Sequence, residues 1–296
     1  MKICRTIEEF RRARSQLDGT VGFVATMGAL HEGHLSLMRN ARERADHLCV
    51  SIFVNPTQFE PGSDYESYPR ELESDAEKCR DLGCELIFAP NPEEMYPDGH
   101  STTVHVEGMD DVLCGPQRPG HFDGVATIVT KLLNIVEPDV AVFGRKDYQQ
   151  LAILRRMVRD LDMPVEIVGA PTVREDDGLA VSSRNRYLDD DERARATCLA
   201  EGLAEAWELW NGGERDAEAL VQAARDVVLN AADPEAIDYV QAVHPDSLER
   251  LDDRPDSTVE DGVVIAMAVH VGEARLIDNL RLDGPLPEEL GDYVTG

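Results

Sequence analysis

Short apolar segments alternate with helical segments over residues 1–172, and this alternation constrains the fold more than any other feature of the chain. The predicted strands, several of them rich in β-branched residues, are residues 21–25, 48–54, 85–88, 139–143 and 165–168. The predicted helices are residues 35–45, 71–82, 125–136 and 148–161. Strands that alternate with helices at this spacing indicate a parallel sheet with right-handed crossovers. The predicted fold class is therefore α/β, with a Rossmann-like parallel sheet.

The pattern changes after residue 172. Two helices and then two strands are predicted there, at residues 190–211, 216–231, 236–243 and 263–271. This order is typical of a smaller α+β domain. We expect two domains, 1–172 and 173–296, with segment 173–184 at their junction, where ligand clefts are common. The tail after Leu282 is expected to be loosely held.

The charge of the chain limits its partners. The sequence has 58 acidic and 29 basic residues, a formal net charge of −29, and only four of its basic residues are lysines. A surface this acidic repels nucleic acid and anionic lipid, so neither is expected as a partner. Excess acid with scarce lysine favours adaptation to a salty cytoplasm, where ions screen the self-repulsion. The alternative is an ordinary solubilising surface.

The six cysteines are scattered, and no CxxC pair or Cys/His cluster has the spacing of a zinc site. No metal site made by the protein alone is therefore expected. Scattered thiols are typical of a reducing compartment. The N-terminus has no apolar signal core, and no window is long and apolar enough to span a bilayer. We expect a cytoplasmic location, away from membranes.

Residues 26–34, TMGALHEGH, follow the first long predicted strand and begin the first predicted crossover helix. In an open α/β sheet, ligands bind at the carboxyl ends of the strands. Free backbone N–H groups at a helix start favour an anion such as phosphate, and Gly33 lets it approach the backbone. His31 and His34 are three residues apart, so both can face that crevice and stabilise charge on an α-phosphate. The alternative is two surface histidines on a loop.

Residues 143–150, FGRKDYQQ, end a later strand and begin a helix. Lysine is unfavourable at a helix start, so Lys146 needs another reason to be there. Its flexible ammonium group can reach the β- and γ-phosphates of a nucleotide. The alternative is a charge pair at the helix N-terminus, with Asp147 near the positive end of the helix dipole.

Residues 180–185, AVSSRN, lie at the expected domain junction. Two hydroxyl groups and a guanidinium group in sequence can clamp a phosphate, and a mobile loop of this kind can close over a nucleotide and exclude water. The alternative is a polar interdomain loop. Gln58 and Gln150 are neutral hydrogen-bonding residues in apolar surroundings, which suits a small hydroxy acid; turn and helix-surface glutamines are the alternative.

Several motifs in one order resemble the pantothenate synthetase (pantoate–β-alanine ligase) family over nearly the whole chain. They are TMGALHEGH, VSIFVNPTQF, DYESYPR, RPGHFDGV, FGRKDYQQL, DGLAVSSRNRYL and GEARLIDN. This family is similar to class I aminoacyl-tRNA synthetases in its HxGH-type signature. The resemblance implies an ATP-dependent ligase that activates pantoate as an acyl-adenylate and transfers the acyl group to β-alanine. It also implies Mg²⁺ with the ATP, a homodimer, and a C-terminal domain that forms a lid over the active site.

The resemblance also implies a role for each matching position. The catalytic residues would be His31, His34, Lys146 and Arg184. The ATP-binding residues would be Met27, Gly28, Ala29, Leu30, His31, Glu32, Gly33, His34, Gly144, Arg145, Lys146, Asp147, Val173, Val181, Ser182, Ser183 and Arg184. Pantoate and β-alanine would be bound by Gln58 and Gln150, with Asn55, Arg118 and His121 as further pocket residues.

Two positions depart from the pattern of the family. Ala25 stands where many members have proline, which should only loosen a turn. Arg145 stands where many have glutamate, which changes a charge beside the expected nucleotide site and bears on the affinity for Mg-ATP. Two other functions remain open from the residues: a nucleotidyltransferase that makes a dinucleotide, and a nucleotide-sensing protein without turnover. The glutamine pair and the lack of an obvious second phosphate site argue against the first. The His34 and Ser-Ser-Arg elements argue against the second.

Overall fold

The computed structural model describes residues 1–59, 65–66, 68–231, 236–254, 257–260 and 262–294. These residues pack into two compact units. The first unit comprises Met1–Glu107, Gln117–Arg145 and Ile153–Pro171. The second comprises Gly108–Pro116, Lys146–Ala152 and Thr172–Gly296. Two short segments from within the first 172 residues therefore belong to the second unit.

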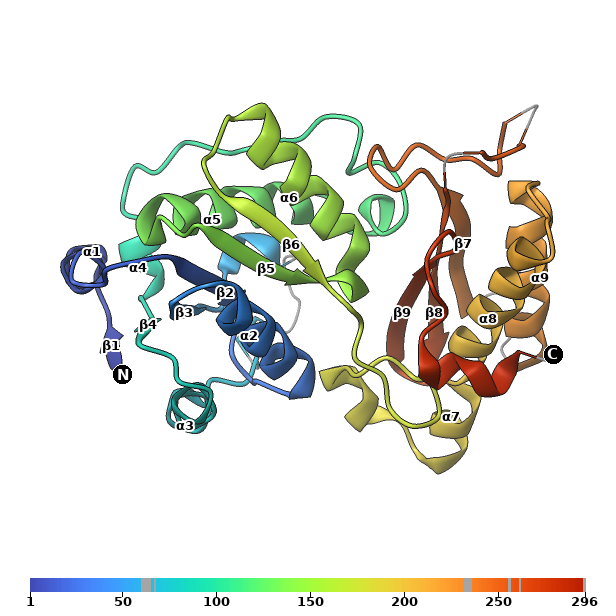
Figure 1. Ribbon diagram of the computed structural model, residues 1–296, viewed down its shortest axis with the longest axis horizontal. Coiled ribbons are helices and arrows are strands. Elements are labelled where there is room, and N and C mark those ends of the chain that lie inside the picture. The colour runs from blue at the N-terminus through green and yellow to red at the C-terminus, as the bar shows by residue number, and fades with distance from the viewer. Residues whose placement is uncertain (60–64, 67, 232–235, 255–256, 261, 295–296) are drawn as a thin grey trace. The chain divides into compact units, whose positions relative to one another are not determined.

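The first unit is built on a six-stranded parallel sheet with the strand order β1-β4-β3-β2-β5-β6 (Figure 1). Its strands are β1 (Lys2–Cys4), β2 (Val21–Thr26), β3 (His47–Ile52), β4 (Leu86–Phe88), β5 (Val140–Gly144) and β6 (Glu166–Ala170). The predicted α/β class with a Rossmann-like parallel sheet is confirmed. The short edge strand β1 was not expected, because three residues give too little pattern to recognise.

Helices cover both faces of this sheet. They are α1 (Ile7–Arg14), α2 (Glu32–Arg44), α3 (Leu72–Asp81), α4 (Pro92–Met95), α5 (His121–Val136) and α6 (Tyr148–Asp160). Helix α2 packs on β2, β3 and β5, and α3 lies beside it. Helix α5 packs beside α1, and its Thr130 hydroxyl contacts the Met157 sulfur of α6 at 3.0 Å. Figure 1 shows α5 and α6 on one side of the sheet and α2 and α3 on the other.

The direction of winding reverses between β2 and β5. From β2 the chain builds β3 and β4 on one side, and then returns to place β5 and β6 on the other. The two central strands pair directly, with Gly22 opposite Val140. The carboxyl ends of strands at such a reversal diverge into loops and leave a crevice for a ligand. The loops that follow Thr26 and Gly144, the last residues of β2 and β5, therefore begin where a ligand site is expected.

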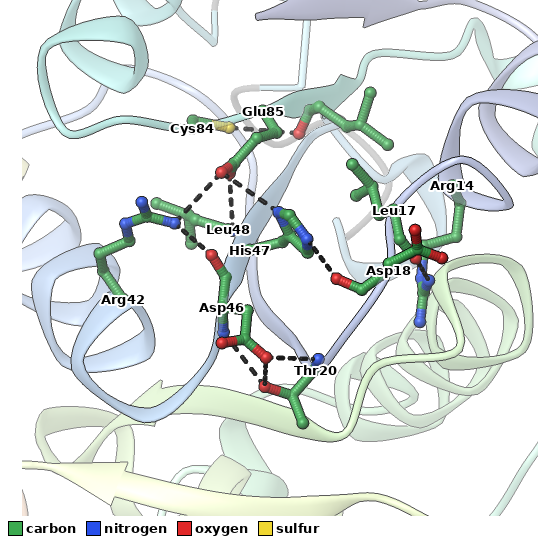
Figure 2. A network of polar contacts seen from close by, with 11 residues as sticks. Arg14, Leu17, Asp18, Thr20, Arg42, Asp46, His47, Leu48, Cys84 and Glu85 are labelled. Carbon is green, nitrogen blue, oxygen red and sulfur yellow. Dashed lines mark hydrogen bonds and ion pairs between the residues drawn. The ribbon is translucent and has the colours of Figure 1, made fainter.

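A polar network lies at the other end of the strands, where β3 and β4 begin (Figure 2). The Glu85 carboxylate accepts hydrogen bonds from the Arg42 guanidinium at 3.1 Å and from the Leu48 N–H at 2.8 Å. The Asp46 carboxylate accepts from both the N–H and the hydroxyl of Thr20, each at 2.9 Å. This network joins α2 to the strand starts, so it fixes the sheet at the end away from the loops described above.

The described part of the second unit includes a three-stranded antiparallel sheet and the α-helices α7, α8 and α9. The strands are β7 (Ile237–Val243), β8 (Val264–Val271) and β9 (Ala274–Arg281), and the helices are α7 (Asp190–Arg195), α8 (Cys198–Asn211) and α9 (Ala217–Ala231). Helices α8 and α9 pack on each other and on the sheet. Their shared core includes Leu203, Leu220 and Met267, all fully buried. The α+β texture is as expected, but β9 is a third strand that the pattern did not predict.

The expectation of a loosely held tail is wrong for residues 283–294. A 3-10 helix spans Glu288–Tyr293, and Leu290 within it is fully buried. The Tyr293 hydroxyl donates to the Asp177 carbonyl at 2.5 Å. The buried Leu290 side chain and the Tyr293 hydroxyl hold this segment in place, although its composition alone is typical of a linker. Thr295 and Gly296, and Asp64 and Ser67 of the DYESYPR motif, lie outside the described residues.

Among the described residues, no helix has both the length and the apolar character needed to cross a bilayer.

Candidate active site

The turn after β2 has an unusual backbone. Gly28 has φ +88° and Ala29 has φ +51°, so two successive residues are in the left-handed region. A non-glycine residue with positive φ is uncommon and persists where its surroundings fix it. Thr26 provides part of this support, because its hydroxyl donates to the Ser51 carbonyl at 2.8 Å and accepts from the Gly28 N–H at 3.2 Å.

Backbone N–H groups of this turn already donate hydrogen bonds to side chains of the protein. The Asp75 carboxylate of α3 accepts from the N–H of Ala29 at 2.9 Å and of Leu30 at 2.8 Å. The N–H groups of His31 and Gly33 donate to imidazole nitrogens within the turn. This differs from the expectation of free N–H groups for a phosphate. An anion bound here must therefore be held largely by side chains.

His31 and His34 form a reciprocal cap at the start of α2. The Nδ1 of His31 accepts from the Gly33 N–H at 3.2 Å, and the Nδ1 of His34 accepts from the His31 N–H at 3.3 Å. A nitrogen that accepts a hydrogen bond carries no proton, so each neutral ring carries its proton on Nε2. The ring centroids are 4.2 Å apart. The backbone thus presents two adjacent imidazoles as Nε2–H donors.

The two other residues of the HEGH sequence have separate roles. A Cβ atom on Gly33 would lie 2.9 Å from Cε1 of His31, so the glycine makes room for that ring. The exposed Glu32 forms an ion pair with Arg39, two helical turns further along α2. Glu32 is therefore tied into a surface pair of α2, which adds little to stability.

A chain of uncharged polar groups lies in the same unit. The Asn55 side chain, buried to 1% exposure, donates to the Gln58 Oε1 at 3.0 Å and to the Gly124 carbonyl at 3.2 Å. The Gln58 Nε2 contacts the Met27 sulfur at 3.0 Å, and the His121 Nδ1 donates to the Gln58 carbonyl at 2.9 Å. Four residues that the sequence singled out separately are therefore brought together here.

Tyr96 completes this group, although no motif in the sequence points to it. Its hydroxyl donates to the Asn55 Oδ1 at 2.7 Å. Burial raises the pKa of Tyr96, and its contacts with Thr57 and Asn55 only partly oppose that shift. The phenol therefore stays protonated at neutral pH and continues to orient the Asn55 amide. The Asn55 amide in turn donates to Gln58, so Tyr96 helps to fix the position of Gln58.

A cavity of about 170 Å³ lies at the carboxyl ends of β2, β3 and β4. Met27, Gly28 and Asp75 contribute to its wall, with Arg5 and Arg70 among the other lining residues. Asn55, Gln58 and His121 do not line it. The turn that carries the histidines therefore borders an open volume on its α3 side.

In the second unit, a short hairpin leads into the Ser-Ser-Arg loop. Arg174 and Ala180 form an antiparallel bridge, and the Val181 N–H donates to the Val173 carbonyl at 2.9 Å. The Arg174 guanidinium makes two hydrogen bonds to the Asp278 carboxylate of β9, at 2.6 and 3.0 Å. Both side chains are 1% exposed. This buried pair joins the hairpin to β9. Loss of either partner would leave the other charge buried and unpaired, so the hairpin is held in place.

The loop itself is exposed at its tip. The Ser182 hydroxyl caps a 3-10 helix, Ser183–Tyr187, by accepting from the Arg184 N–H at 3.2 Å. Ser183 and Arg184 are exposed. A firm hairpin that ends in exposed hydroxyl and guanidinium groups suits a loop that contacts a ligand.

Lys146, Ser182 and Arg184 line one small hollow of the second unit, together with Arg275 of β9. Asp278 also lines it, but its carboxylate is committed to Arg174. Arg275 donates through Nε to Asp238 at 2.6 Å. Lys146 and Arg184, with the Asp238-paired Arg275, thus surround one hollow of a chain with net charge −29, an arrangement that suits an anion. Sequence analysis missed Arg275, although it lies within the GEARLIDN motif.

The remaining predicted residues have varied surroundings. The Arg145 side chain donates to the Gly169 carbonyl of β6 at 3.0 Å, so the residue that replaces glutamate is tied to the neighbouring strand. Asp147 is exposed and Gln150 is half-buried. The adjacent Gln149 is the buried glutamine: its amide binds the carbonyls of Met109 and Val112 at 3.0 and 2.8 Å. Arg118 contributes its carbonyl to the turn that starts α5.

Comparison with known proteins places these features in a family. The family model described as Pantoate-beta-alanine ligase matches residues 2–281. A pantothenate synthetase of Syntrophotalea carbinolica is 53% identical over 259 residues, covering 88% of this chain and 89% of the relative. One of Acetivibrio thermocellus is 48% identical over 286 residues, covering 95% and 99%.

Solved structures agree. The pantothenate synthetase of Thermus thermophilus has a TM-score of 0.87 at 48% identity, covering 95% of this chain and 99% of that one. The pantoate-beta-alanine ligase of Francisella tularensis, complexed with beta-gamma ATP and beta-alanine, has a TM-score of 0.72 at 32% identity, covering 96% and 99%. With its parallel sheet, its HxGH turn and this match over almost its whole length, the chain belongs to the pantoate–β-alanine ligase family.

Proposed function

We propose that this chain condenses pantoate with β-alanine at the expense of ATP. In the first step, a pantoate carboxylate oxygen attacks the α-phosphorus and forms pantoyl-adenylate, while the bond to pyrophosphate breaks. In the second step, the β-alanine amine attacks the acyl carbon, and AMP leaves as the amide forms and the amine loses a proton. The names of the relatives support this reaction, as does the Francisella enzyme with its bound ATP and β-alanine.

The observation that carries the proposal is the pair of hydrogen bonds after β2 in which Nδ1 of His31 and Nδ1 of His34 each accept from a backbone N–H. Charge develops on the α-phosphate oxygens as the carboxylate attacks, and two preorganised Nε2–H donors stabilise that charge. The turn, Met27 to His34, would hold the nucleotide near its α-phosphate. A donor role fits this geometry better than a base role, because each Nδ1 already accepts a hydrogen bond.

Lys146, Ser182, Ser183 and Arg184 would hold the β- and γ-phosphates and stabilise the departing pyrophosphate. The cationic hollow that Lys146, Ser182 and Arg184 share supports this role. Gly144, Arg145, Asp147, Val173 and Val181 would complete the nucleotide site. Mg²⁺ would enter with the triphosphate, since it prefers phosphate and water oxygens. The Asp278 carboxylate in the hollow is already paired with Arg174. We therefore expect the side chains of the hollow to contact the phosphates directly and not through the metal ion.

Pantoate and β-alanine would be recognised in a hydrogen-bonding pocket built around the uncharged Gln58. Gln58 is held from both ends of its amide by Asn55 and Met27, which supports its role in orienting a small hydroxy acid. Gln150, Arg118 and His121 would complete this pocket. Preorganised amides lose little entropy when the ligand binds.

Three further properties belong to the proposal. A homodimer follows from the family resemblance and is tested by sedimentation equilibrium. The boundary at residue 172 is tested by expressing 1–172 alone and measuring whether it unfolds cooperatively. A cytoplasmic location is supported by six cysteines that are all buried free thiols, as expected in a reducing compartment.

The test of the proposed function is exchange of labelled pyrophosphate into ATP with pantoate and without β-alanine. We expect exchange that depends on pantoate, and AMP rather than ADP once β-alanine is added. A dinucleotide-forming enzyme would need a second nucleotide for product, and a nucleotide sensor would release neither AMP nor ADP. Formation of ADP and phosphate would reject the adenylate route.

Substitution of Gly28 by alanine should lower kcat for AMP formation by about 10-fold, since small misplacements at a reacting centre have effects of this order or larger. Gly28 has φ +88°, and an added Cβ would lie 3.0 Å from Asp75 Oδ2 and 3.3 Å from Ile52 Cγ2, so the turn must shift. Gly99→Ala is the matched control, because Gly99 has φ +84° but nothing lies within 4 Å. Equal activity of the two variants would show that the turn geometry is unimportant.

The acidic composition predicts that salt stabilises the protein. Screening weakens the self-repulsion of a chain with net charge −29, so the unfolding temperature should rise between 0.1 and 1 M KCl. A gain of about 2 kcal/mol corresponds to a rise of about 4–8 °C for a protein of this size. Thermal unfolding followed by circular dichroism measures it. A flat or falling unfolding temperature below 1 M would indicate an ordinary solubilising surface.

A further inference from the structure

The buried Asp75 carboxylate of α3 binds the backbone of the turn that leads to His31 and His34. The Asp75 side chain is 1% exposed, and its two oxygens accept from the N–H groups of Ala29 and Leu30 at 2.9 and 2.8 Å. Hydrogen bonds to a charged acceptor are roughly twice as strong as neutral ones. Both oxygens of the buried Asp75 carboxylate therefore accept hydrogen bonds from two successive residues of one turn.

Lys78, one helical turn later on α3, holds the same turn by its carbonyl side. Its Nζ donates to the Leu30 carbonyl at 2.8 Å and lies 3.9 Å from Asp75 Oδ1. Leu30 is thus held through both its N–H and its C=O by α3. Lys78 is one of only four lysines in the chain, so its presence here needs a reason beyond solubility.

The turn needs this support because of its backbone. Ala29 has φ +51°, a conformation that a residue with a Cβ adopts only where its surroundings fix it. Gly28 packs so closely on α3 that an added Cβ would lie 3.0 Å from Asp75 Oδ2. His31 follows Leu30 directly and caps α2 together with His34. A shift of Ala29 and Leu30 therefore moves both imidazoles.

We propose that Asp75 and Lys78 are positioning residues for the adenylation step. They fix the backbone of Gly28 to Leu30 so that His31 and His34 present their Nε2–H groups at the α-phosphate. They do this without contacting the substrate. This proposal rests on the proposed function, because it assumes that the histidine pair acts on ATP.

The competing explanation is a purely structural role, in which Asp75 only holds α3 to the sheet. The two explanations differ in what a substitution changes. Loss of packing lowers stability and the amount of folded enzyme. Loss of positioning lowers kcat in the folded enzyme, and does so only while the histidines are there to be positioned.

The first experiment is Asp75→Asn, which keeps the size of the side chain but replaces one acceptor oxygen by an NH₂ group. One turn N–H then faces a donor. We expect kcat for pantoate-dependent ATP–pyrophosphate exchange to fall about 10- to 100-fold, as for small misplacements of catalytic groups. The KM values for ATP and pantoate should change little. Glu77→Gln on the exposed side of α3 is the matched control and should leave kcat unchanged.

The decisive readout is a double-mutant cycle with His34→Ala. If Asp75 acts through the turn, Asp75→Asn should lower kcat much less in the His34→Ala background than in the wild type. An equal fold reduction in both backgrounds would overturn the proposal, because Asp75 would then act independently of the histidine.

Lys78→Met keeps Asp75 and removes only the bond to the Leu30 carbonyl, so it decides the matter if Asp75→Asn does not fold. We expect a smaller loss of kcat, again weaker in the His34→Ala background. Normal exchange by the folded Lys78→Met and Asp75→Asn variants, with His34→Ala impaired, would reject the positioning role alone. Normal exchange by His34→Ala would instead reject the proposed function of the turn.

Discussion

Lys146→Ala should lower kcat for AMP formation by about 10²–10³-fold, the usual loss when one preorganised charge donor is removed. The ammonium group lines the hollow with Arg184 and Arg275, where it would neutralise charge on the departing pyrophosphate. The backbone should stay in place, because the Lys146 carbonyl accepts from the Asn279 side chain at 2.8 Å irrespective of the side chain at position 146. Steady-state kinetics with saturating ATP, pantoate and β-alanine measure the loss.

Two further variants make this result specific. Lys2→Ala removes another lysine from the exposed edge strand β1 and should leave kcat unchanged. Lys146→Arg keeps the charge but replaces a compact ammonium by a planar fork, so it should recover only part of the rate. Near-normal turnover of Lys146→Ala would remove Lys146 from the mechanism.

His34→Asn should lower kcat for pyrophosphate exchange by about 10²–10³-fold, whereas His34→Gln should retain a larger share of the activity. An asparagine amide lies near the position of Nδ1, so it can accept from the His31 N–H but offers no donor at the place of Nε2. A glutamine amide reaches that place and can donate there. The variant that keeps more activity therefore shows whether Nδ1 or Nε2 of His34 supports catalysis.

The control for both variants is Glu43→Gln, which changes an exposed side chain in the last turns of α2, away from the histidines. Equal loss in His34→Asn and His34→Gln would indicate that the imidazole transfers a proton. Higher activity in His34→Asn would indicate that capping α2 matters more than donation. Either result would contradict the donor role assigned to Nε2.

Much of the architecture could be predicted from the sequence because the strands of a parallel sheet are buried on both faces and are read as apolar runs. The turn at residues 26–34 could be located for the same reason, as it directly follows such a run. The state of its backbone could not be predicted. Asp75 lies 46 positions from Ala29 along the chain, and only the packing of α3 beside α2 brings its carboxylate to the turn.

The second unit shows the same limit. The Ser-Ser-Arg loop has a local signature, so Ser182 and Arg184 could be singled out. Arg275 has none, because one arginine in a strand reads as a surface residue until the sheet places it beside the loop. Gln149 and Gln150 are neighbours in sequence, and only the structure shows that Gln149 is the one buried against the carbonyls of Met109 and Val112. The anchored tail at Leu290 likewise depends on a partner far along the chain.

The central claim is that the carboxylate of pantoate attacks the α-phosphorus of ATP. Pantoate labelled with ¹⁸O in its carboxylate tests it directly, with the full reaction run to completion and the phosphorus products analysed by mass spectrometry. The account predicts one ¹⁸O atom in AMP and none in pyrophosphate, because the oxygen that bridges acyl carbon and phosphorus leaves with AMP. Unlabelled AMP, or label in inorganic phosphate together with ADP, would contradict the account.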